Sequence, residues 1–212
     1  MRLKNLLLSV PVVLALSLAS YANTLSLNVV NGNLFQQIAQ RPCIFSNQSC
    51  VNGGFPSTDV PNSGSETSYD LLSPIYAGSS ILPLLSGGSL VVGIDINQAT
   101  GAGSQTLTRF EMLKNGVVVD TFVGSGPNVP ATNNGNGFAD FLLSNFSSFV
   151  AADTVRFHFV FDNANDGPEN VFIASVPATA APEPASLVLT GLGVLSLGLV
   201  LFKRQRRAGQ IH

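Results

Sequence analysis

The densest group of oxygen-bearing side chains in the chain lies in residues 162–170, directly after a run of aromatic residues. If the segment binds a calcium ion, its candidate ligands are Asp162, Asn163, Asp166 and Glu169. Carboxylate and amide oxygens are the ligands that Ca²⁺ prefers, although the spacing lacks the glycine and the terminal glutamate of an EF-hand loop. A solvated turn is the more common meaning of such a segment, because Asn and Asp side chains hydrogen-bond to nearby backbone and Gly accepts a positive φ. The segment is therefore either a calcium site, with Asp95 and Asn97 as additional ligands, or a turn.

Sequence motifs of the familiar enzymes are missing. His158 is the one histidine of residues 23–180. It occupies an outward-facing position of an expected aromatic strand, where a lone histidine is typically structural. The chain has no Gly-x-Ser-x-Gly, no His-Glu-x-x-His, no phosphate-binding loop and no dinucleotide fingerprint. The two catalytic carboxylates of a glycoside hydrolase come from distant strands, so their spacing in the sequence has no fixed pattern. A polysaccharide hydrolase therefore remains an alternative. We expect a protein that is not an enzyme and assign no catalytic residue.

Cys43 and Cys50 are the two cysteines of the chain, with six residues between them. Two thiols this close in a loop are expected to pair in an oxidising compartment. A metal site would need further ligands, and the Cys-x-x-Cys spacing is absent. The sequence predicts a structural disulfide.

Residues 1–22 are typical of a secretory signal peptide. Arg2 and Lys4 precede an apolar stretch over residues 6–18, and small residues lead up to Ala22. This apolar stretch is short for a membrane span, which disfavours an uncleaved anchor. We expect signal peptidase to cut after Ala22 and the following residues to be exported.

The C-terminal region combines a short motif, an apolar run and a basic end. The motif is Pro182, Glu183 and Pro184, and the apolar run covers residues 185–202. The basic residues of the tail at 203–212 include Lys203, Arg204, Arg206 and Arg207. A helix over the apolar run would be roughly 27 Å long, enough to cross a hydrocarbon core of about 30 Å. The basic cluster is expected to stop transfer and to stay in the cytoplasm.

This order of motif, span and basic end closely resembles the PEP-CTERM sorting signal of Gram-negative bacteria. The resemblance covers about residues 182–207 and includes the sequence Pro-Glu-Pro-Ala-Ser and a span interrupted by glycine. It implies processing by an exosortase, a membrane-embedded cysteine protease or transpeptidase that would cut near the motif. The alternative is a stiff proline linker before an ordinary anchor, because such prolines favour extended backbone. A GPI signal should not end in basic residues, and the Leu-Pro-x-Thr-Gly motif of a Gram-positive sortase is absent.

The expected exported part is acidic. Residues 23–180 hold eleven carboxylates against four Lys and Arg side chains, which gives a net charge of −7. Such a surface is repelled by phosphate backbones, so nucleic acid is not an expected partner. It would attract divalent cations or remain soluble in an anionic polysaccharide matrix.

Residues 23–176 are expected to form one extracytoplasmic domain, followed by a linker over 177–184 that ends in the Pro-Glu-Pro motif. Val155, Phe157, Phe159 and Phe161 alternate with polar residues, which is typical of a strand with one buried face. Strands are expected over residues 25–30, 90–96, 106–113, 117–123, 154–161 and 171–176. We predict a mainly β fold, an antiparallel β-sandwich of jelly-roll or immunoglobulin-like type, with a single C-terminal transmembrane helix.

Asn115-Gly116 between two such runs predicts a two-residue hairpin turn. Its simplest register puts Phe110 and Met112 on the core side and sets Glu111 opposite Asp120, where like charges repel. A slipped register remains an alternative. Residues 138–149 fit a helix or a strand, and we expect long loops over residues 31–89, with a short helix near 35–39.

These features together predict an exported envelope protein with a non-catalytic structural or adhesive role at the cell surface or in an exopolysaccharide biofilm matrix. Its processing partners would be signal peptidase and exosortase, acting at the inner membrane. The alternative is a calcium-dependent carbohydrate-binding module, and the third candidate is an envelope polysaccharide hydrolase.

Overall fold

The computed structural model describes residues 22–46, 50–61, 68–97, 104–130, 135–164 and 169–177. The predicted signal peptide up to residue 21, the Pro-Glu-Pro motif, the apolar span and the basic tail lie outside these ranges. Within them the chain is mainly β, and no helix there has both the length and the apolar character needed to cross a bilayer. The elements are β1 (Asn23–Thr24), β2 (Ser26–Val29), β3 (Cys43–Ser46), β4 (Thr58–Asp59), β5 (Ser68–Leu72), β6 (Tyr76–Ala77), α1 (Gly78–Leu85), β7 (Ser89–Asp95), β8 (Thr106–Lys114), β9 (Val117–Val123), β10 (Phe141–Ser144), β11 (Thr154–Asp162) and β12 (Asn170–Val176).

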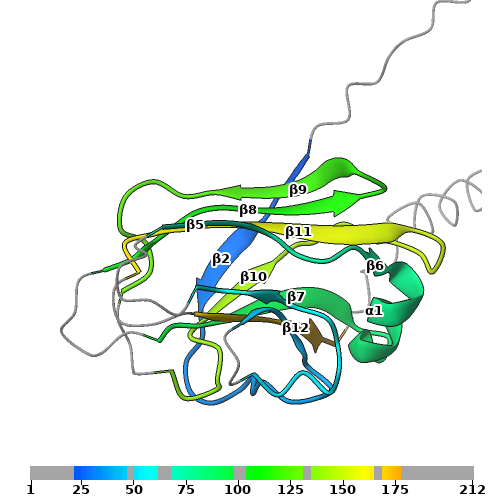
Figure 1. Cartoon of the computed structure of the whole chain (residues 1–212), viewed down its shortest axis with the longest axis horizontal. Coiled ribbons are helices and arrows are strands. Elements are labelled where there is room, and N and C mark those ends of the chain that lie inside the picture. The colour runs from blue at the N-terminus through cyan, green and yellow to red at the C-terminus, as the bar shows by residue number, and fades with distance from the viewer. Residues whose placement is uncertain are drawn as a thin grey trace, which may run out of the picture.

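The strands form two mixed sheets that lie as two layers (Figure 1). The first sheet has the order β1-β9-β8-β11-β5, with β6 also paired with β11. The second has the order β2-β10-β7-β12-β3-β4. The long pairs are antiparallel as predicted, but β1 pairs with β9 and β3 with β4 in parallel, so the expectation of purely antiparallel sheets is wrong for these short edge strands. The loop between β3 and β4 is long enough to bring the chain back in the same direction.

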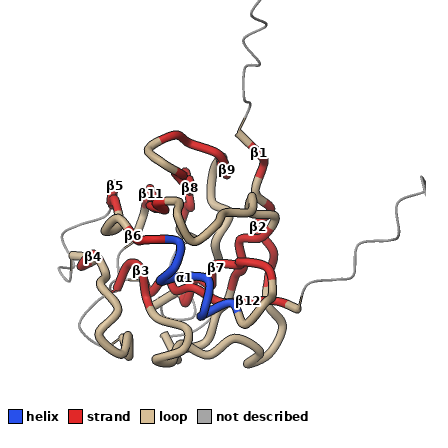
Figure 2. Tube along the Cα trace, turned by 90° about the vertical axis from the view of Figure 1, so that its right-hand side faces the viewer, coloured by secondary structure: helices blue, strands red, loops and turns tan. Residues whose placement is uncertain are grey.

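Eight of the described strands pair as a nested ribbon. The outermost pair is β3 with β12, followed inward by β5 with β11, β7 with β10 and β8 with β9, all antiparallel. The pairs β7·β12 and β8·β11 then join the ribbon into the two sheets. Figure 2, turned by 90°, shows α1 and β6 beside the ends of these layers, and β1 beside β9.

The core lies between the two sheets. On β11 the side chains of Val155, Phe157, Phe159 and Phe161 are all buried, which confirms the predicted alternation. Phe159 contacts aromatic rings from both layers, with its ring centroid 5.3 Å from that of Phe45 on β3 and 6.4 Å from that of Phe110 on β8. Because its three phenylalanines are fully buried between the sheets, β11 lies at the centre of the core.

The predicted hairpin turn is confirmed. Asn115 and Gly116 have φ values of 53° and 80° and connect β8 to β9. Both residues tolerate the left-handed region that a two-residue turn requires.

The predicted register of this hairpin is wrong beyond the first two pairs. A bulge between Met112 and Leu113 shifts the pairing, so that Met112 faces Asp120 and Glu111 faces Thr121. Glu111 and Asp120 are therefore not opposite one another. The bulge separates two like charges that would destabilise the pair, and Asp120 instead accepts hydrogen bonds from the backbone N–H and the hydroxyl of Ser147.

The expectation of long loops and a short helix in residues 31–89 is wrong in part. Residues 35–39 form isolated β-bridges through Gln36 and Ile38, and the helix is α1, at Gly78–Leu85. The strand β3 has all four residues buried, so it carries no alternation that would reveal it. The ambiguous segment 138–149 contains the strand β10.

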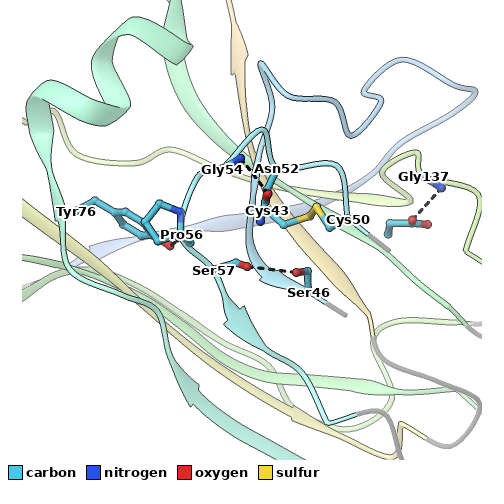
Figure 3. The surroundings of a disulfide bond; sticks show 10 residues. Cys43, Ser46, Cys50, Asn52, Gly54, Pro56, Ser57, Tyr76 and Gly137 are labelled. Atoms are coloured by element: carbon cyan, nitrogen blue, oxygen red, sulfur yellow. Dashed lines mark hydrogen bonds between the residues drawn. A yellow bond between two sulfur atoms is a disulfide. The ribbon is translucent and has the colours of Figure 1, made fainter. Parts of the chain in front are cut away.

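The predicted disulfide between Cys43 and Cys50 is present, with its Cα atoms 6.4 Å apart (Figure 3). It belongs to a small second core with Val91, Ala139 and Phe172, on the outer side of the second sheet. The disulfide therefore fixes the chain that follows β3 against this sheet.

Candidate functional site

A group of buried polar residues lies at the end of the two layers opposite α1. Because α1 leads directly into β7, the C-terminal end of β7 lies at the far end of the sheets, where β12 begins (Figure 1). We call this group the end cluster: Asp95, Gln105, Asp140, Glu169 and Asn170, all buried. Its members come from both sheets, since Gln105 precedes β8 and the others belong to β7, β10 and β12 or to their ends.

Glu169 and Gln105 form one half of the end cluster. Gln105 Nε2 donates a hydrogen bond of 2.7 Å to Glu169 Oε1, and both residues are 0% exposed. Burial raises the pKa of Glu169 to about 7, against the opposing effect of the Gln105 hydrogen bond. The second oxygen of the carboxylate, Oε2, and the amide oxygen of Gln105 have no hydrogen-bond partner.

Asp95 and Asn170 form the other half, as directly paired residues of β7 and β12. The Gly137 N–H donates a hydrogen bond of 2.9 Å to Asp95 Oδ2, drawn as a dashed line in Figure 3. The side chain of Asn170 also hydrogen-bonds to Asp95. Burial raises the pKa of Asp95 to about 6, and the nearby Asp140 carboxylate adds to the shift. Oδ1 of Asp95 and Oδ1 of Asn170 have no hydrogen-bond partner.

Asp140 lies next to Asp95 on the neighbouring strand. Phe141 on β10 pairs with Ile94 on β7 in antiparallel register. Asp140, which precedes Phe141, therefore faces Asp95, which follows Ile94. Asp140 Oδ2 accepts a hydrogen bond of 2.8 Å from the N–H of Ile96. This bond fixes the end of β7 against the start of β10.

The end cluster concentrates acceptor oxygens in the interior. Leaving a buried polar group without a partner costs about 1–3 kcal/mol, so such atoms are rare in folded proteins. Among the described residues no group of three His, Cys, Asp or Glu side chains is arranged to hold a metal ion. The unpartnered oxygens here belong to two carboxylates and two carboxamides, and both types are ligands of hard cations such as Ca²⁺.

The four predicted calcium ligands have different positions. Asp162 Oδ2 accepts a hydrogen bond of 2.7 Å from Thr108 Oγ1, and Asn163 has a φ of 65°, which suits a turn. Glu169 is buried in the end cluster beside Asp95, the residue that was expected to join the site. Asp166 lies outside the described residues.

Sequence reasoning missed Gln105, Asp140 and the role of Asn170. Asn170 stands at the first position of β12, and its polarity at the start of an apolar strand was a usable signal. Nothing in the sequence marks Gln105, because only the three-dimensional fold brings it to Glu169.

His158 is held between two carboxylates on the face of β11 opposite the core. Its Nδ1 lies 2.7 Å from Glu111 Oε2, and its Nε2 lies 2.7 Å from Asp70 Oδ1. Burial lowers the pKa of His158, but the hydrogen bonds and charges of Glu111 and Asp70 outweigh it, so that the net shift is upward. Both ring nitrogens are engaged, which favours a structural role for this histidine.

Comparisons with protein-family models, curated proteins and solved structures found no match to this chain.

Proposed function

We propose that this chain is an exported envelope protein that is sorted by an exosortase and has a non-catalytic structural or adhesive role. The observation that carries the proposal is the order of the Pro-Glu-Pro motif at 182–184, the apolar run at 185–202 and the basic tail. The signal-peptide pattern of residues 1–22 supports export from the other end of the chain. The disulfide of Cys43 and Cys50 supports an oxidising compartment outside the cytoplasm.

In this account signal peptidase removes the signal peptide after Ala22. The C-terminal span then anchors the chain in the inner membrane, with the folded domain in the periplasm. Exosortase then cuts near Pro182–Pro184, and the domain reaches the cell surface or the exopolysaccharide matrix. The net charge of −7 over residues 23–180 favours a hydrated and soluble surface in such a matrix. The engagement of both nitrogens of His158 supports a role without catalysis.

The fold that we propose for the exported domain is a jelly-roll β-sandwich. The nested pairing supports it, because the first strand of the ribbon, β3, pairs with the last strand, β12, within one sheet. In an immunoglobulin-like sandwich the first and last strands lie in different sheets. The chain also alternates between the sheets from β9 to β12, as wrapping a nested ribbon into two layers requires.

Replacement of the motif tests the sorting proposal. In the triple variant Pro182→Ala/Glu183→Ala/Pro184→Ala, we expect the uncut chain to accumulate in the inner membrane, while the wild-type domain reaches the surface or matrix fraction. Pro177→Ala, a proline outside the motif, is the matched control and should behave like the wild type. Equal retention of wild type and triple variant in the membrane would instead support an ordinary anchor.

Calcium-dependent carbohydrate binding is a second candidate function. The unpartnered oxygens of Asp95, Glu169 and Asn170 favour it, because they provide hard ligands for Ca²⁺. The test is co-sedimentation of the purified chain with exopolysaccharide from the producing cells, in CaCl₂ and in EGTA. Binding that is lost in EGTA supports this candidate, and binding that is equal in both, or absent, contradicts it.

A further inference from the structure

We propose that the end cluster binds one Ca²⁺ ion through the carboxylates of Asp95 and Glu169 and the side-chain amide oxygens of Gln105 and Asn170. This site is built inside the domain and differs from the predicted loop site, of whose four main ligands it uses only Glu169, together with Asp95, which was predicted as an additional ligand. It does not require sorting by an exosortase, so the two proposals can fail separately. It rests on four features of the end cluster.

The first feature is the concentration of unpartnered acceptors. Among the described residues, five buried side-chain oxygens have no hydrogen-bond partner, and four of them belong to these residues: Asp95 Oδ1, Gln105 Oε1, Glu169 Oε2 and Asn170 Oδ1. Asp95 is 1% exposed and Asn170 is 7% exposed, and the other two are fully buried. Every one of these atoms is an acceptor, so a cation within reach of all four would satisfy them. Protonation of the carboxylates is the competing way to satisfy these oxygens, because each carboxyl O–H can donate to an amide oxygen, but it gives no dependence of stability on Ca²⁺.

The second feature is the proximity of the four side chains. Glu169 and Asn170 are consecutive, Asn170 is the direct cross-strand partner of Asp95, and Gln105 is hydrogen-bonded to Glu169. Directly paired residues of antiparallel strands have Cα atoms about 4.5–5.5 Å apart, which allows their side chains to share one ion. The Asp95 and Glu169 carboxylates also interact electrostatically.

The third feature is the orientation of the two carboxylates. Each is held by neutral N–H donors: the backbone of Gly137 and Asn136 and the side chain of Asn170 for Asp95, and Gln105 for Glu169. One oxygen of each is left without a partner. Neither carboxylate is in an ion pair, since the ion pairs between described side chains are those of His158. Two buried negative charges without a cation are strongly unfavourable, and a divalent ion would compensate both.

The fourth feature is the chemistry of the ligands, which selects the ion. All four are oxygens, and neither His nor Cys is among them, which disfavours Zn²⁺. Ca²⁺ accepts six to eight oxygen ligands in flexible geometry, whereas Mg²⁺ demands a near-ideal octahedron and retains water. A site with two carboxylates fits the weaker range of extracellular calcium modules, with a Kd of about 0.1–1 mM.

Bound calcium would connect the two sheets at this end. Gln105 leads into β8 of the first sheet, while Asp95 and Asn170 end β7 and begin β12 of the second. The ion would therefore stabilise the domain at the end opposite α1.

The test is thermal unfolding of the purified full-length chain in EGTA and in 10 mM CaCl₂. We expect Ca²⁺ to raise Tm by about 3–10 °C, from the expected Kd and the size of the domain. The shift should be lost in Asp95→Asn and in Glu169→Gln, which keep the shape of each side chain but remove its charge. In EGTA at pH 8 both variants should be at least as stable as the wild type, because a buried charge is removed. The matched control is Asp59→Asn, an exposed carboxylate on β4, which should keep the full shift.

Three results would overturn the proposal. One is a wild-type Tm that does not respond to 10 mM CaCl₂, and another is an equal shift in Asp95→Asn and Glu169→Gln. The third is a shift that is lost in Asp162→Asn but kept in Asp95→Asn, which would place the ion in the 162–170 loop. If either variant fails to fold, calorimetric titration of the wild type decides: one ion per chain is expected, and no binding up to 10 mM contradicts the site.

Discussion

Gln105 donates a hydrogen bond of 2.7 Å to the carboxylate of Glu169 in the fully buried interior of the domain. The two residues precede strands of different sheets, β8 and β12, so this single bond connects the layers at one end. The donor is neutral, and the second carboxylate oxygen has no partner. The interaction therefore orients a buried carboxylate without compensating its charge.

Substitution of Glu169 separates the effects of shape and charge. Glu169→Ala should lower the free energy of unfolding in EGTA by about 2–4 kcal/mol, because it leaves a cavity and removes the partner of Gln105. Glu169→Gln keeps the volume and an acceptor oxygen and should cause no such loss. Urea denaturation of the two variants measures the difference, and equal losses would contradict the assigned hydrogen bond.

Gly93 is expected to be intolerant of any side chain. A Cβ atom at this position of β7 would lie 2.6 Å from Cζ of Phe172, its cross-strand partner on β12. Gly93→Ala should therefore destabilise the domain by about 1–3 kcal/mol through overpacking. The double variant Gly93→Ala/Phe172→Leu should recover part of this loss relative to the sum of the single variants, as a double-mutant cycle measures. Strictly additive losses would show that the two residues do not contact one another.

The disulfide of Cys43 and Cys50 should contribute about 2–3 kcal/mol, the value expected for the closure of a short loop. Urea denaturation of the wild type with and without a reductant measures this contribution. The double variant Cys43→Ala/Cys50→Ala is the control, because its stability should not respond to the reductant. A wild type whose stability is unchanged on reduction would contradict the prediction.

The pairing of His158 with Asp70 and Glu111 predicts a stability that falls as the pH rises. The pKa of His158 is raised above its ordinary value of 6.5, despite partial burial, by the two carboxylates that face it. The stabilisation is then fully present below about pH 6.5 and is lost as the pH rises through the folded-state pKa. The gap in Tm between the wild type and His158→Gln should therefore be largest near pH 6 and should close toward pH 9. A gap that widens with pH would contradict the assigned pairing, and Asp59→Asn should show no such dependence.

The sequence was sufficient to predict elements with a strong local pattern. The alternation of Val155, Phe157, Phe159 and Phe161 identified β11, and Asn115-Gly116 identified the hairpin, because both signals depend on neighbours in the chain. The strand β3 was missed because all its residues are buried, which removes the alternation. The bulge after Met112 was missed because only the environments of Glu111 and Asp120 in the folded domain determine it.

The candidate site was predictable only in part. The density of Asp and Asn in residues 162–170 drew attention to Glu169, and the strand end at Asp95 was recognised as a possible neighbour. Gln105 and Asp140 lie in other segments of the chain. The pairing of β10 with β7 brings Asp140 beside Asp95, and the packing of the two sheets brings Gln105 to Glu169. Asp162 illustrates the opposite case, since a conspicuous carboxylate accepts a hydrogen bond from Thr108.

The central claim, sorting through the C-terminal tail, is tested most directly by mass spectrometry of the mature C-terminus in native cells and in cells without the exosortase. We predict that the native chain ends near Pro182–Pro184 and that the uncut tail accumulates when the enzyme is absent. A native chain that still carries Lys203 to Arg207 in both strains would contradict the claim and would make the tail an ordinary membrane anchor.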